Sequence, residues 1–596
     1  MQGTKSASAI SVEPLQQLLS VFIAGRYGEA EALAETLVAQ DGAPGLAWKI
    51  LGYAKLAQEK NAVAALKKAL AFFPQDAELC GNLGNAHRNL GQHESALICY
   101  RTAVMLAPQR ALGHYNLGAG FQDQHKLADA MRAYSEAIRL KPDFAEAYNQ
   151  LGIVKQKLGR VDEAISDFHT AIHHKPDFPA PYSNLLFYSN YATIETAEKL
   201  LAQARNYGAL VRRSAQPFTS WPNTRNAERC LRIGLVSGDL RSHPVAYFLD
   251  SVLDALMRRA PGRFEIVAYS NHNLDDAQTA RIKKMCHGWH AVANWSDAAL
   301  VEQIRHDGID ILFDLSGHTN LNRLPVFAWK PAPVQVSWLG FYSTTGVAAI
   351  DYLLADPVAV TPEGEAYFTE KIWRLPEVFS CFSAPNLGAS TPEVSPLPAL
   401  QNGYVTFGSF NNLAKLNDKV LALWARILQS LPGSRLFFKT RQLGEPETAQ
   451  AMRDKFAAHG IGAERLILEG HSPRAELLAA YRRVDIVLDP FPYTGCTTTA
   501  EALWMGVPVL TKLGDTFLGR QSASFLHAAG LQQWIAEDDD DYVARAIACV
   551  GDLPALSRLR SGLRPQVLAS PVYDADRFAG HFETALRAMW MDWCAA

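Results

Sequence analysis

Two adjacent threonines, Thr497 and Thr498, stand where the sequence predicts a phosphate-binding site. They follow an apolar run at residues 486–488 and a proline-rich turn, and they open a helix-forming AEALWMG segment. This order of strand, loop and helix leaves unpaired backbone N–H groups at a helix start, and these groups can hold a diphosphate just past Gly495. Glu501, one turn further, could accept from ribose hydroxyls. A threonine-capped helix without a ligand is the alternative.

Polar residues after two other strands of the C-terminal region could complete such a site. The segment SFNNLAKLND, at 409–418, supplies Asn412 and Lys415. Lys415 could place positive charge on a leaving phosphate, and Asn412 could support the same group. Ser472 and Arg474 follow the apolar run RLILEGH, a place suited to reading a nucleotide base. A lysine on a solvated helix surface is the alternative for Lys415.

Candidate acid–base residues lie further towards the N-terminus. Pro244 restricts His243 to an extended backbone, so its ring is expected in a loop before a helix, where it could act as a general base or orient a sugar hydroxyl. Asp307 precedes an apolar run at 309–317 and is a second candidate proton acceptor. His318 follows that run and is a cleft candidate, and Gly340 lies in a loop whose bare backbone could approach a sugar. A structural hydrogen bond for His243 and a turn-forming role for Asp307 are the alternatives.

Composition narrows the class of protein. The chain has 596 residues, too many for one core, and its 57 basic and 60 acidic residues give a net charge of -3, which argues against bulk nucleic-acid or membrane binding. The eight cysteines form no C-x-x-C pair, so free thiols in a reducing compartment are expected. We find no leader-like or membrane-spanning run and no Walker A motif, and we expect a cytoplasmic protein with no metal and no cofactor.

The N-terminal third is a repeat. Prolines recur every 34 residues at 74, 108, 142 and 176, and Gly84 and Gly118 keep the same period, as do the aromatic residues Tyr100 and Tyr134. This is the tetratricopeptide pattern, which predicts an all-α solenoid of paired helices. Such a surface binds extended peptide. Dimerisation, or bracing of the second module, is the alternative role.

Apolar β-rich runs separated by helical segments follow the repeats and predict two doubly wound α/β halves joined by a proline-rich hinge. Ligands of such sheets bind at the carboxyl ends of the strands, where the polar motifs fall. The predicted domains are the solenoid at 14–190, a linker at 191–228, the first half at 229–385, a linker between the halves at 386–403, and the second half with a closing helix at 404–592.

Five motifs follow the repeats in a characteristic order: LRIGLVSGDLRSHP, DLSGHT, KPAPVQVSWLGFYSTTG, SFNNLAKLND and DPFPYTGCTTTAEALWMGVPVLT. In this order the chain resembles the protein O-linked N-acetylglucosamine transferases and their Spindly-type relatives, and it looks most like the compact bacterial-type members, from about residue 45 to 590. The resemblance implies a GT-B glycosyltransferase, metal-independent and inverting. It would move N-acetylglucosamine from UDP-GlcNAc to Ser or Thr of polypeptides that the repeats recognise, and it could be a homodimer.

The resemblance also assigns roles. His243 and Asp307 match residues proposed as alternative proton acceptors, and Lys415 matches the lysine that stabilises the β-phosphate. The positions matching the nucleotide-sugar site are Asn412, Ser472, Arg474, Gly495, Cys496, Thr497, Thr498 and Glu501. From their positions after the strands, and not from the resemblance, Pro244, His318 and Gly340 are expected in the sugar and acceptor cleft.

The chain departs from the pattern at two places: Cys496 and Leu477 stand where many members carry His. Diphosphate binding should persist, because the backbone N–H groups at the helix start survive either change. Two alternatives stay open: a protein O-fucosyltransferase that uses GDP-fucose, and a tetratricopeptide scaffold with little catalysis.

Overall fold

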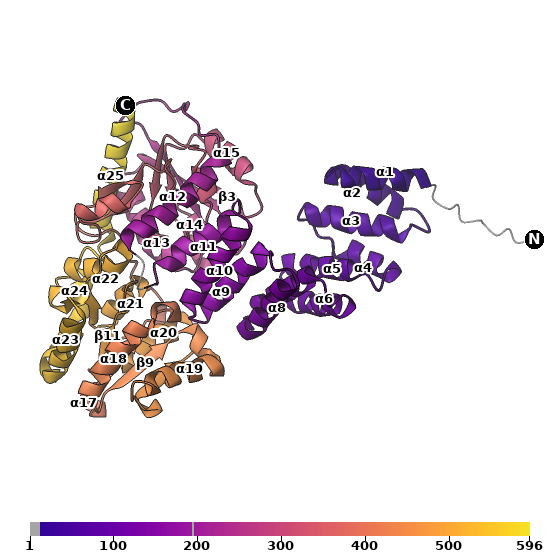
Figure 1. The fold of residues 1–596 in the computed structure, drawn as a ribbon. Helices are drawn as coiled ribbons and strands as arrows, with labels where there is room; N and C mark the ends of the chain where they lie inside the picture. The colour runs from indigo at the N-terminus through magenta and orange to yellow at the C-terminus, as the bar shows by residue number, and fades with distance from the viewer. Residues whose placement is uncertain (1–11, 193–195) are drawn as a thin grey trace, which may run out of the picture. The chain divides into compact units, whose positions relative to one another are not determined.

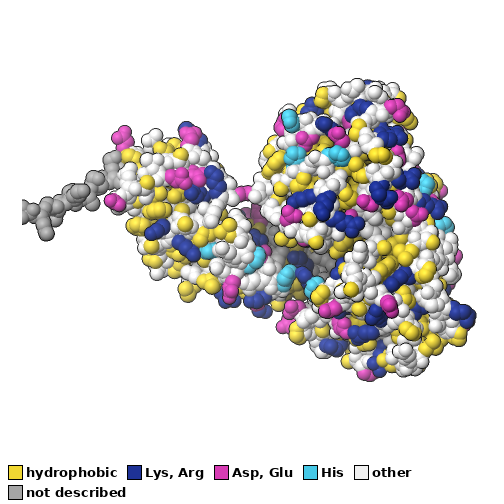
Figure 2. Space-filling model, turned by 180° about the vertical axis from the view of Figure 1, so that it is seen from behind, with side chains coloured by type: hydrophobic (Ala, Val, Ile, Leu, Met, Phe, Trp, Pro, Cys, Tyr) yellow, Lys and Arg dark blue, Asp and Glu magenta, His cyan; other side chains and the backbone are white. Residues whose placement is uncertain are grey.

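A computed structural model describes residues 12–192 and 196–596 (Figure 1). Contacts divide the chain into two units, Met1–Lys155 with Ser166–Pro176, and Gln156–Ile165 with Asp177–Ala596. Within the described ranges no helix combines the length and the apolar character needed to cross a membrane. Acidic and basic side chains are intermingled on the face shown in Figure 2, in keeping with the near-neutral net charge.

The predicted helical repeats are confirmed. The chain runs through antiparallel helix pairs, and each repeat proline follows the end of the second helix of a pair by two residues. The helices are α1 (Val12–Ile23), α2 (Tyr27–Val38), α3 (Gly45–Ala57), α4 (Val63–Phe72), α5 (Ala77–Asn89), α6 (His93–Leu106), α7 (Ala111–Asp123), α8 (Leu127–Leu140), α9 (Ala145–Lys157) and α10 (Val161–His174).

The periodic glycines and aromatics pack against each other within the repeats. A Cβ atom on Gly84 would lie 2.4 Å from the Tyr100 ring, and one on Gly118 would lie 2.7 Å from the Tyr134 ring. Both tyrosines are buried, and their hydroxyls hydrogen-bond to Asn85 and Gln122. The 34-residue period therefore results from one close helix crossing in each repeat, where only glycine leaves room for the aromatic ring.

The second unit contains the two predicted α/β halves, and every strand pair in them is parallel. The first sheet has the order β3-β2-β1-β4-β5-β6-β7 and the second the order β10-β9-β8-β11-β12-β13. The strand order reverses between β1 and β4 in the first sheet and between β8 and β11 in the second. Ligands of doubly wound sheets bind at such reversals, beyond the carboxyl ends of the strands.

The strands confirm most of the predicted apolar runs. They are β1 (Leu231–Ser237), β2 (Phe264–Ser270), β3 (Gly288–Ala291), β4 (Ile311–Asp314), β5 (Val334–Ser337), β6 (Tyr352–Ala355), β7 (Lys371–Arg374), β8 (Thr406–Ser409), β9 (Arg435–Lys439), β10 (Leu466–Glu469), β11 (Ile486–Leu488), β12 (Val509–Lys512) and β13 (Ile535–Ala536). The sequence did not predict β3 or β13. Both are short edge strands, so neither is an apolar run buried on both sides.

Helices cover both sheets. They are α11 (Pro179–Ser189), α12 (Ala197–Arg213), α13 (Pro244–Arg259), α14 (Ala277–Lys283), α15 (Asp297–His306), α16 (Leu324–Phe327), α17 (Ala399–Asn402), α18 (Asp418–Ser430), α19 (Pro446–Ala457), α20 (Arg474–Ala480), α21 (Thr497–Trp504), α22 (Phe517–Ala528), α23 (Asp539–Gly551), α24 (Leu553–Leu568) and α25 (Ala575–Ala595). Helix α23 begins at Asp539, where the side chain of Asp538 caps it by accepting from the N–H of Asp541.

The two halves share one continuous core. The last helix, α25, returns to the first half and packs on α13 (Figure 1), and its Phe582 stacks on Trp338 with ring centroids 4.8 Å apart. From the second half, α22 reaches the first: Phe517 lies 5.1 Å from the Phe379 ring, and Arg520 donates to the carbonyl of Val358 at 2.7 Å. These contacts fix the two strand reversals relative to each other within this unit.

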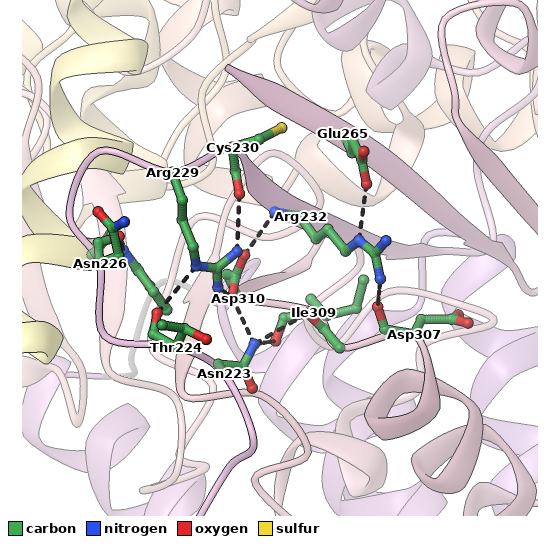
Figure 3. A network of polar contacts seen from close by, with 12 residues as sticks. Asn223, Thr224, Asn226, Arg229, Cys230, Arg232, Glu265, Asp307, Ile309 and Asp310 are labelled. Carbon is green, nitrogen blue, oxygen red and sulfur yellow. Dashed lines mark hydrogen bonds and ion pairs between the residues drawn. The ribbon is translucent and has the colours of Figure 1, made fainter. Parts of the chain in front are cut away.

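The segment that enters the first sheet is held by a buried carboxylate (Figure 3). Asp310 is fully buried and accepts from the guanidinium of Arg229, from the amide of Asn223 at 2.6 Å, and from the backbone N–H of Arg232 at 2.8 Å. The predicted linker is therefore anchored at its C-terminal end to the amino edge of β1 and β4.

Candidate functional site

The helix predicted to hold phosphate begins at Thr497 with its first amides free. The preceding residue, Cys496, makes no side-chain capping hydrogen bond. Among the described residues, none accepts from the backbone N–H groups of Thr497 and Thr498, because the first intrahelical bond is made by Ala500 to the carbonyl of Cys496. Both threonines are partly exposed. The start of α21 therefore offers adjacent donors and a positive dipole end to an anion.

The turn before this helix is fixed by another buried carboxylate. Asp489, at the end of β11, is 1% exposed and accepts from the N–H of Gly495 at 2.8 Å and from the hydroxyl of Thr511 at 2.7 Å. A Cβ atom on Gly495 would lie 2.5 Å from the Thr499 hydroxyl and 2.9 Å from Asp489. Glycine is needed here for close approach of these groups, and the turn is held rigidly.

Lys415 reaches the same turn from the loop after β8. Its ammonium donates to the carbonyl of Thr494 at 2.7 Å and lies 4.2 Å from the centre of the Tyr493 ring. Burial lowers the pKa of Lys415 to about 8, while the charge of Asp489 acts in the opposite direction. The structure thus brings a predicted cation to the turn that leads into the free helix start, at a residue 79 positions away in sequence.

A partly buried ion pair links α20 to α21. Arg474 donates to the carboxylate of Glu501 at 2.6 Å, and its guanidinium lies 4.1 Å from the ring centre of Tyr247, which belongs to the first half. Burial raises the pKa of Glu501, and Arg474 acts in the opposite direction. This contact joins residues of both halves within one turn of the Thr497 helix start.

Ser472 and Asn412 flank this region. The hydroxyl of Ser472 is buried and has no hydrogen-bond partner among the described residues. Asn412 is exposed, and its side-chain oxygen accepts from the N–H of Ala414 at 3.0 Å and from the amide of Gln442 at 3.1 Å. An unsatisfied buried hydroxyl beside Arg474 is a place where a ligand could supply the missing partner.

His243 takes the position that the sequence predicts for it, between β1 and α13. Its backbone is extended, Pro244 is the first residue of the helix, and Tyr247 follows one turn later. Its Nδ1 lies 3.4 Å from the N–H of Val245 and 3.6 Å from the carboxylate of Asp239, and no described residue hydrogen-bonds Nε2. Burial lowers the pKa of His243, and Asp239 acts against it. The ring is therefore neutral near pH 7, with one nitrogen free.

Asp307 is not brought to this site. It follows the last residue of α15 and precedes β4, so it lies at the amino edge of the first sheet, whereas His243 follows the carboxyl end of β1. Its carboxylate accepts from the Tyr269 hydroxyl at 2.7 Å and from Gln303 at 2.8 Å, and it lies 3.0 Å from the His290 ring. Figure 3 shows Asp307 beside Arg232. The structure thus favours the turn-forming alternative for this residue.

His318 does not face an open cleft either. It is 2% exposed, and its two ring nitrogens lie 2.8 Å from the Ser183 hydroxyl and 2.9 Å from the Thr345 carbonyl. Burial lowers its pKa to about 4. The structure therefore does not place His318 in the predicted cleft, since both nitrogens are occupied and the ring fixes α11 to the loop after β5.

Gly340 has a packing role. A Cβ atom there would lie 2.2 Å from the carbonyl oxygen of Leu315, so this loop fits tightly against the end of β4. Approach of its backbone to a sugar stays a prediction.

Cys496 lies at the junction of the halves. Its thiol is beside the hydroxyl of Tyr342, and burial raises its pKa to about 12, with Lys415 acting in the opposite direction. The thiol is therefore neutral near pH 7. The position supplies an uncharged group next to the cation.

Sequence reasoning missed the partners that orient these residues. Tyr247, Tyr493 and Tyr342 all contact predicted site residues, yet an isolated tyrosine gives no sequence signal. Asp489 follows the apolar run at 486–488, and an aspartate at the end of a strand gives no sequence signal that it will hold the next turn. Asp239 carried a usable signal, because it stands four residues before His243 in the same loop.

No group of three or more His, Cys, Asp or Glu side chains is arranged to hold a metal ion in the parts of the chain that the structure describes.

Comparisons with known proteins agree with this architecture. Glycosyl transferase family 41 matches residues 209–383 and 397–582, and tetratricopeptide repeats match 77–110, 121–159 and 145–177. A solved structure of a Thermobaculum terrenum O-GlcNAc transferase mutant is similar with a TM-score of 0.79 at 34% identity, covering 89% of this chain and 99% of that one.

Two plant relatives are similar over the same region. The proteins from Petunia hybrida and Arabidopsis thaliana are both described as probable UDP-N-acetylglucosamine–peptide N-acetylglucosaminyltransferase SPINDLY. They are 38% and 37% identical over 421 and 425 residues, which is 69% of this chain in both cases and 44% and 45% of theirs. The chain therefore spans less than half the length of these relatives.

Proposed function

The chain belongs to Glycosyl transferase family 41, and from this premise we propose that it transfers N-acetylglucosamine from UDP-GlcNAc to Ser or Thr hydroxyls of polypeptides. One observation carries the proposal: the ammonium of Lys415 lies 2.7 Å from the carbonyl of Thr494, three residues before the free N–H groups of Thr497 and Thr498. A cation and a free helix start side by side suit a nucleotide diphosphate.

In this proposal the diphosphate accepts from the amides of Thr497 and Thr498, and Lys415 neutralises charge on the departing β-phosphate. Glu501, held by Arg474, takes the ribose hydroxyls, and the Ser472 hydroxyl faces the base. Positive charge at the helix start and at Lys415 supports a reaction that needs no metal.

His243 is the proposed proton acceptor. This role needs the ring proton on Nδ1, towards the Asp239 carboxylate 3.6 Å away and in place of the hydrogen bond that Nδ1 accepts from the Val245 N–H, so that Nε2 takes the proton of the acceptor hydroxyl. The hydroxyl oxygen then bonds to the anomeric carbon as the bond to the diphosphate breaks on the opposite side, which inverts the sugar. The position of Asp307 at the far edge of its sheet favours His243 of the two candidates.

The acceptor is proposed to be an extended peptide presented by the helical repeats. Repeat surfaces of this kind bind such segments. A cytoplasmic location, independence of metals and a homodimer stay predictions for this chain.

The test is transfer by the purified full chain to a mixed pool of Ser- and Thr-containing peptides, followed by mass spectrometry, with UDP-GlcNAc and GDP-fucose in parallel. Addition of N-acetylhexosamine only from UDP-GlcNAc supports the proposal. Addition of deoxyhexose from GDP-fucose would show that the donor is GDP-fucose and not UDP-GlcNAc. No transfer from either donor, with peptide binding intact, would favour the scaffold.

A further inference from the structure

A groove of about 950 Å³ lies beside α12 in the second unit, away from the residues of the diphosphate site. Its borders are α12, the segment at 217–221, and the loops at 346–349 and 368–369. This volume lies in the range of sites that bury a drug-sized ligand or a few residues of peptide.

Two arginines of α12 give the groove its charge. Arg205 and Arg212 both line it, are both exposed, and stand seven residues apart, so they lie on one face of the helix about 10 Å apart along its axis. No carboxylate among the described residues forms an ion pair with either guanidinium. The third cation of the lining, Lys330, is paired with Asp351. The lining therefore carries two uncompensated positive charges.

Much of the remaining lining is apolar, and its wall is fixed in place. Phe218 and Trp221 form one wall: the backbone N–H of Phe218 donates to the Trp329 carbonyl at 2.9 Å, and the Trp221 indole donates to the Lys330 carbonyl at 3.0 Å. Helix α12 packs closely on the loop at 346–349: a Cβ atom on Gly208 would lie 1.7 Å from the carbonyl oxygen of Gly346. The groove is thus a preformed surface.

We propose that this groove binds an acidic peptide segment in which two carboxylate side chains flank apolar ones. An extended chain in the polyproline II conformation advances about 3.1 Å per residue with three residues per turn, so carboxylates three residues apart lie on the same side, about 9 Å apart, and match the spacing of Arg205 and Arg212. Guanidinium groups are the side chains best suited to pair with carboxylates. The apolar residues between the two acids lie against Phe218 and Trp221. A small anion reaches only one arginine and leaves this wall uncovered.

The experiment measures fluorescence anisotropy of a fluorescein-labelled peptide with a Glu-Leu-Leu-Glu core, added to the full-length chain without any sugar nucleotide. The double variant Arg205→Glu, Arg212→Glu is compared with Arg213→Glu. Arg213 makes a matched control because it is exposed on the same helix but does not line the groove.

We expect the double variant to weaken peptide binding at least about tenfold, since two charge pairs are lost and replaced by repulsion. The Arg213→Glu variant should stay within about twofold, and a Gln-Leu-Leu-Gln peptide should bind the unaltered chain as weakly as the double variant binds the acidic one. Equal binding by the double variant would overturn the proposal, as would an equal loss in Arg213→Glu. A single-stranded oligonucleotide that bound as tightly, with the same dependence on Arg205 and Arg212, would also overturn the proposal, because the ligand of the groove would then be a nucleic acid.

This inference is independent of the proposed transferase reaction, because binding is measured without a donor. Loss of acidic-peptide binding in the double variant should leave transfer of the sugar to short neutral peptides unchanged. If the unaltered chain transferred no sugar, the anisotropy measurement of peptide binding would still stand.

Discussion

Removal of the Lys415 ammonium is the perturbation with the largest expected effect on the reaction. In the structure this group lies against the Thr494 carbonyl, at the turn that leads into α21. A diphosphate at that helix start would come within about 4 Å of it, where two unit charges interact by about 4 kcal/mol at the effective dielectric near a protein surface. If this interaction is made chiefly with the leaving group, Lys415→Ala should lower kcat by two to three orders of magnitude, roughly 10²–10³.

The assay is release of UDP from UDP-GlcNAc in the presence of acceptor peptide, with donor affinity measured by calorimetry. Lys419→Ala is the matched control, since it removes the same charge from an exposed position four residues further along. Thermal melts should show both variants folded. A Lys415→Ala variant with kcat within about threefold of the unaltered chain would refute the reasoning.

The pH profile gives a second check on the same residue. Because the pKa of Lys415 is about 8, kcat/KM for the donor should fall as the pH rises above that value. The unfolded chain holds this proton up to about pH 10.4, so the contribution of Lys415 to folding stability rises with pH over the same interval. The fall in activity above pH 8 would therefore come from loss of the Lys415 charge and not from unfolding of the chain. A kcat/KM that is flat to pH 9.5 would contradict the assignment.

Three further predictions concern other parts of the chain. His243→Ala should lower kcat by about 10²–10⁴ in the peptide transfer assay, whereas Asp307→Asn should stay within about threefold, and the reverse order would exchange their roles. Asp310→Ala leaves the arginine and amide donors shown in Figure 3 unpaired and should lower the free energy of unfolding by about 3–5 kcal/mol in urea titrations; a loss under 1 kcal/mol would contradict this. Gly208→Ala should lower the free energy of unfolding by about 1–3 kcal/mol, because the added Cβ meets a carbonyl oxygen at 1.7 Å. Gly562→Ala, at an open helical position, should raise it by up to about 1 kcal/mol. Similar melting temperatures for the two variants would count against the packing argument.

Much of the fold was predictable because its signals are local. The 34-residue period follows from one glycine–tyrosine crossing per repeat, seen at Gly84 and Tyr100. The buried parallel strands are continuous apolar runs, and the groups at their carboxyl ends come together for topological reasons. Lys415 and Thr497 were therefore predictable as neighbours, since β8 and β11 are adjacent at the strand reversal of the second sheet.

The differences between the expected and the observed positions of His318 and Asp307 have a common physical cause. A residue type indicates what a side chain can do, but exposure and partners decide what it does. His318 follows a strand as a cleft residue should, yet Ser183 and Thr345 occupy both of its nitrogens. Asp307 lies beside the Tyr269 hydroxyl at the wrong edge of the sheet. Both contacts are long-range, and no local pattern in the sequence encodes them.

The most direct test of the central claim is a crystal structure of the full chain with UDP. The account predicts diphosphate oxygens within about 3.2 Å of the backbone nitrogens of Thr497 and Thr498 and of the Lys415 ammonium. A diphosphate bound elsewhere, with these amides and the ammonium free of it, would contradict the account.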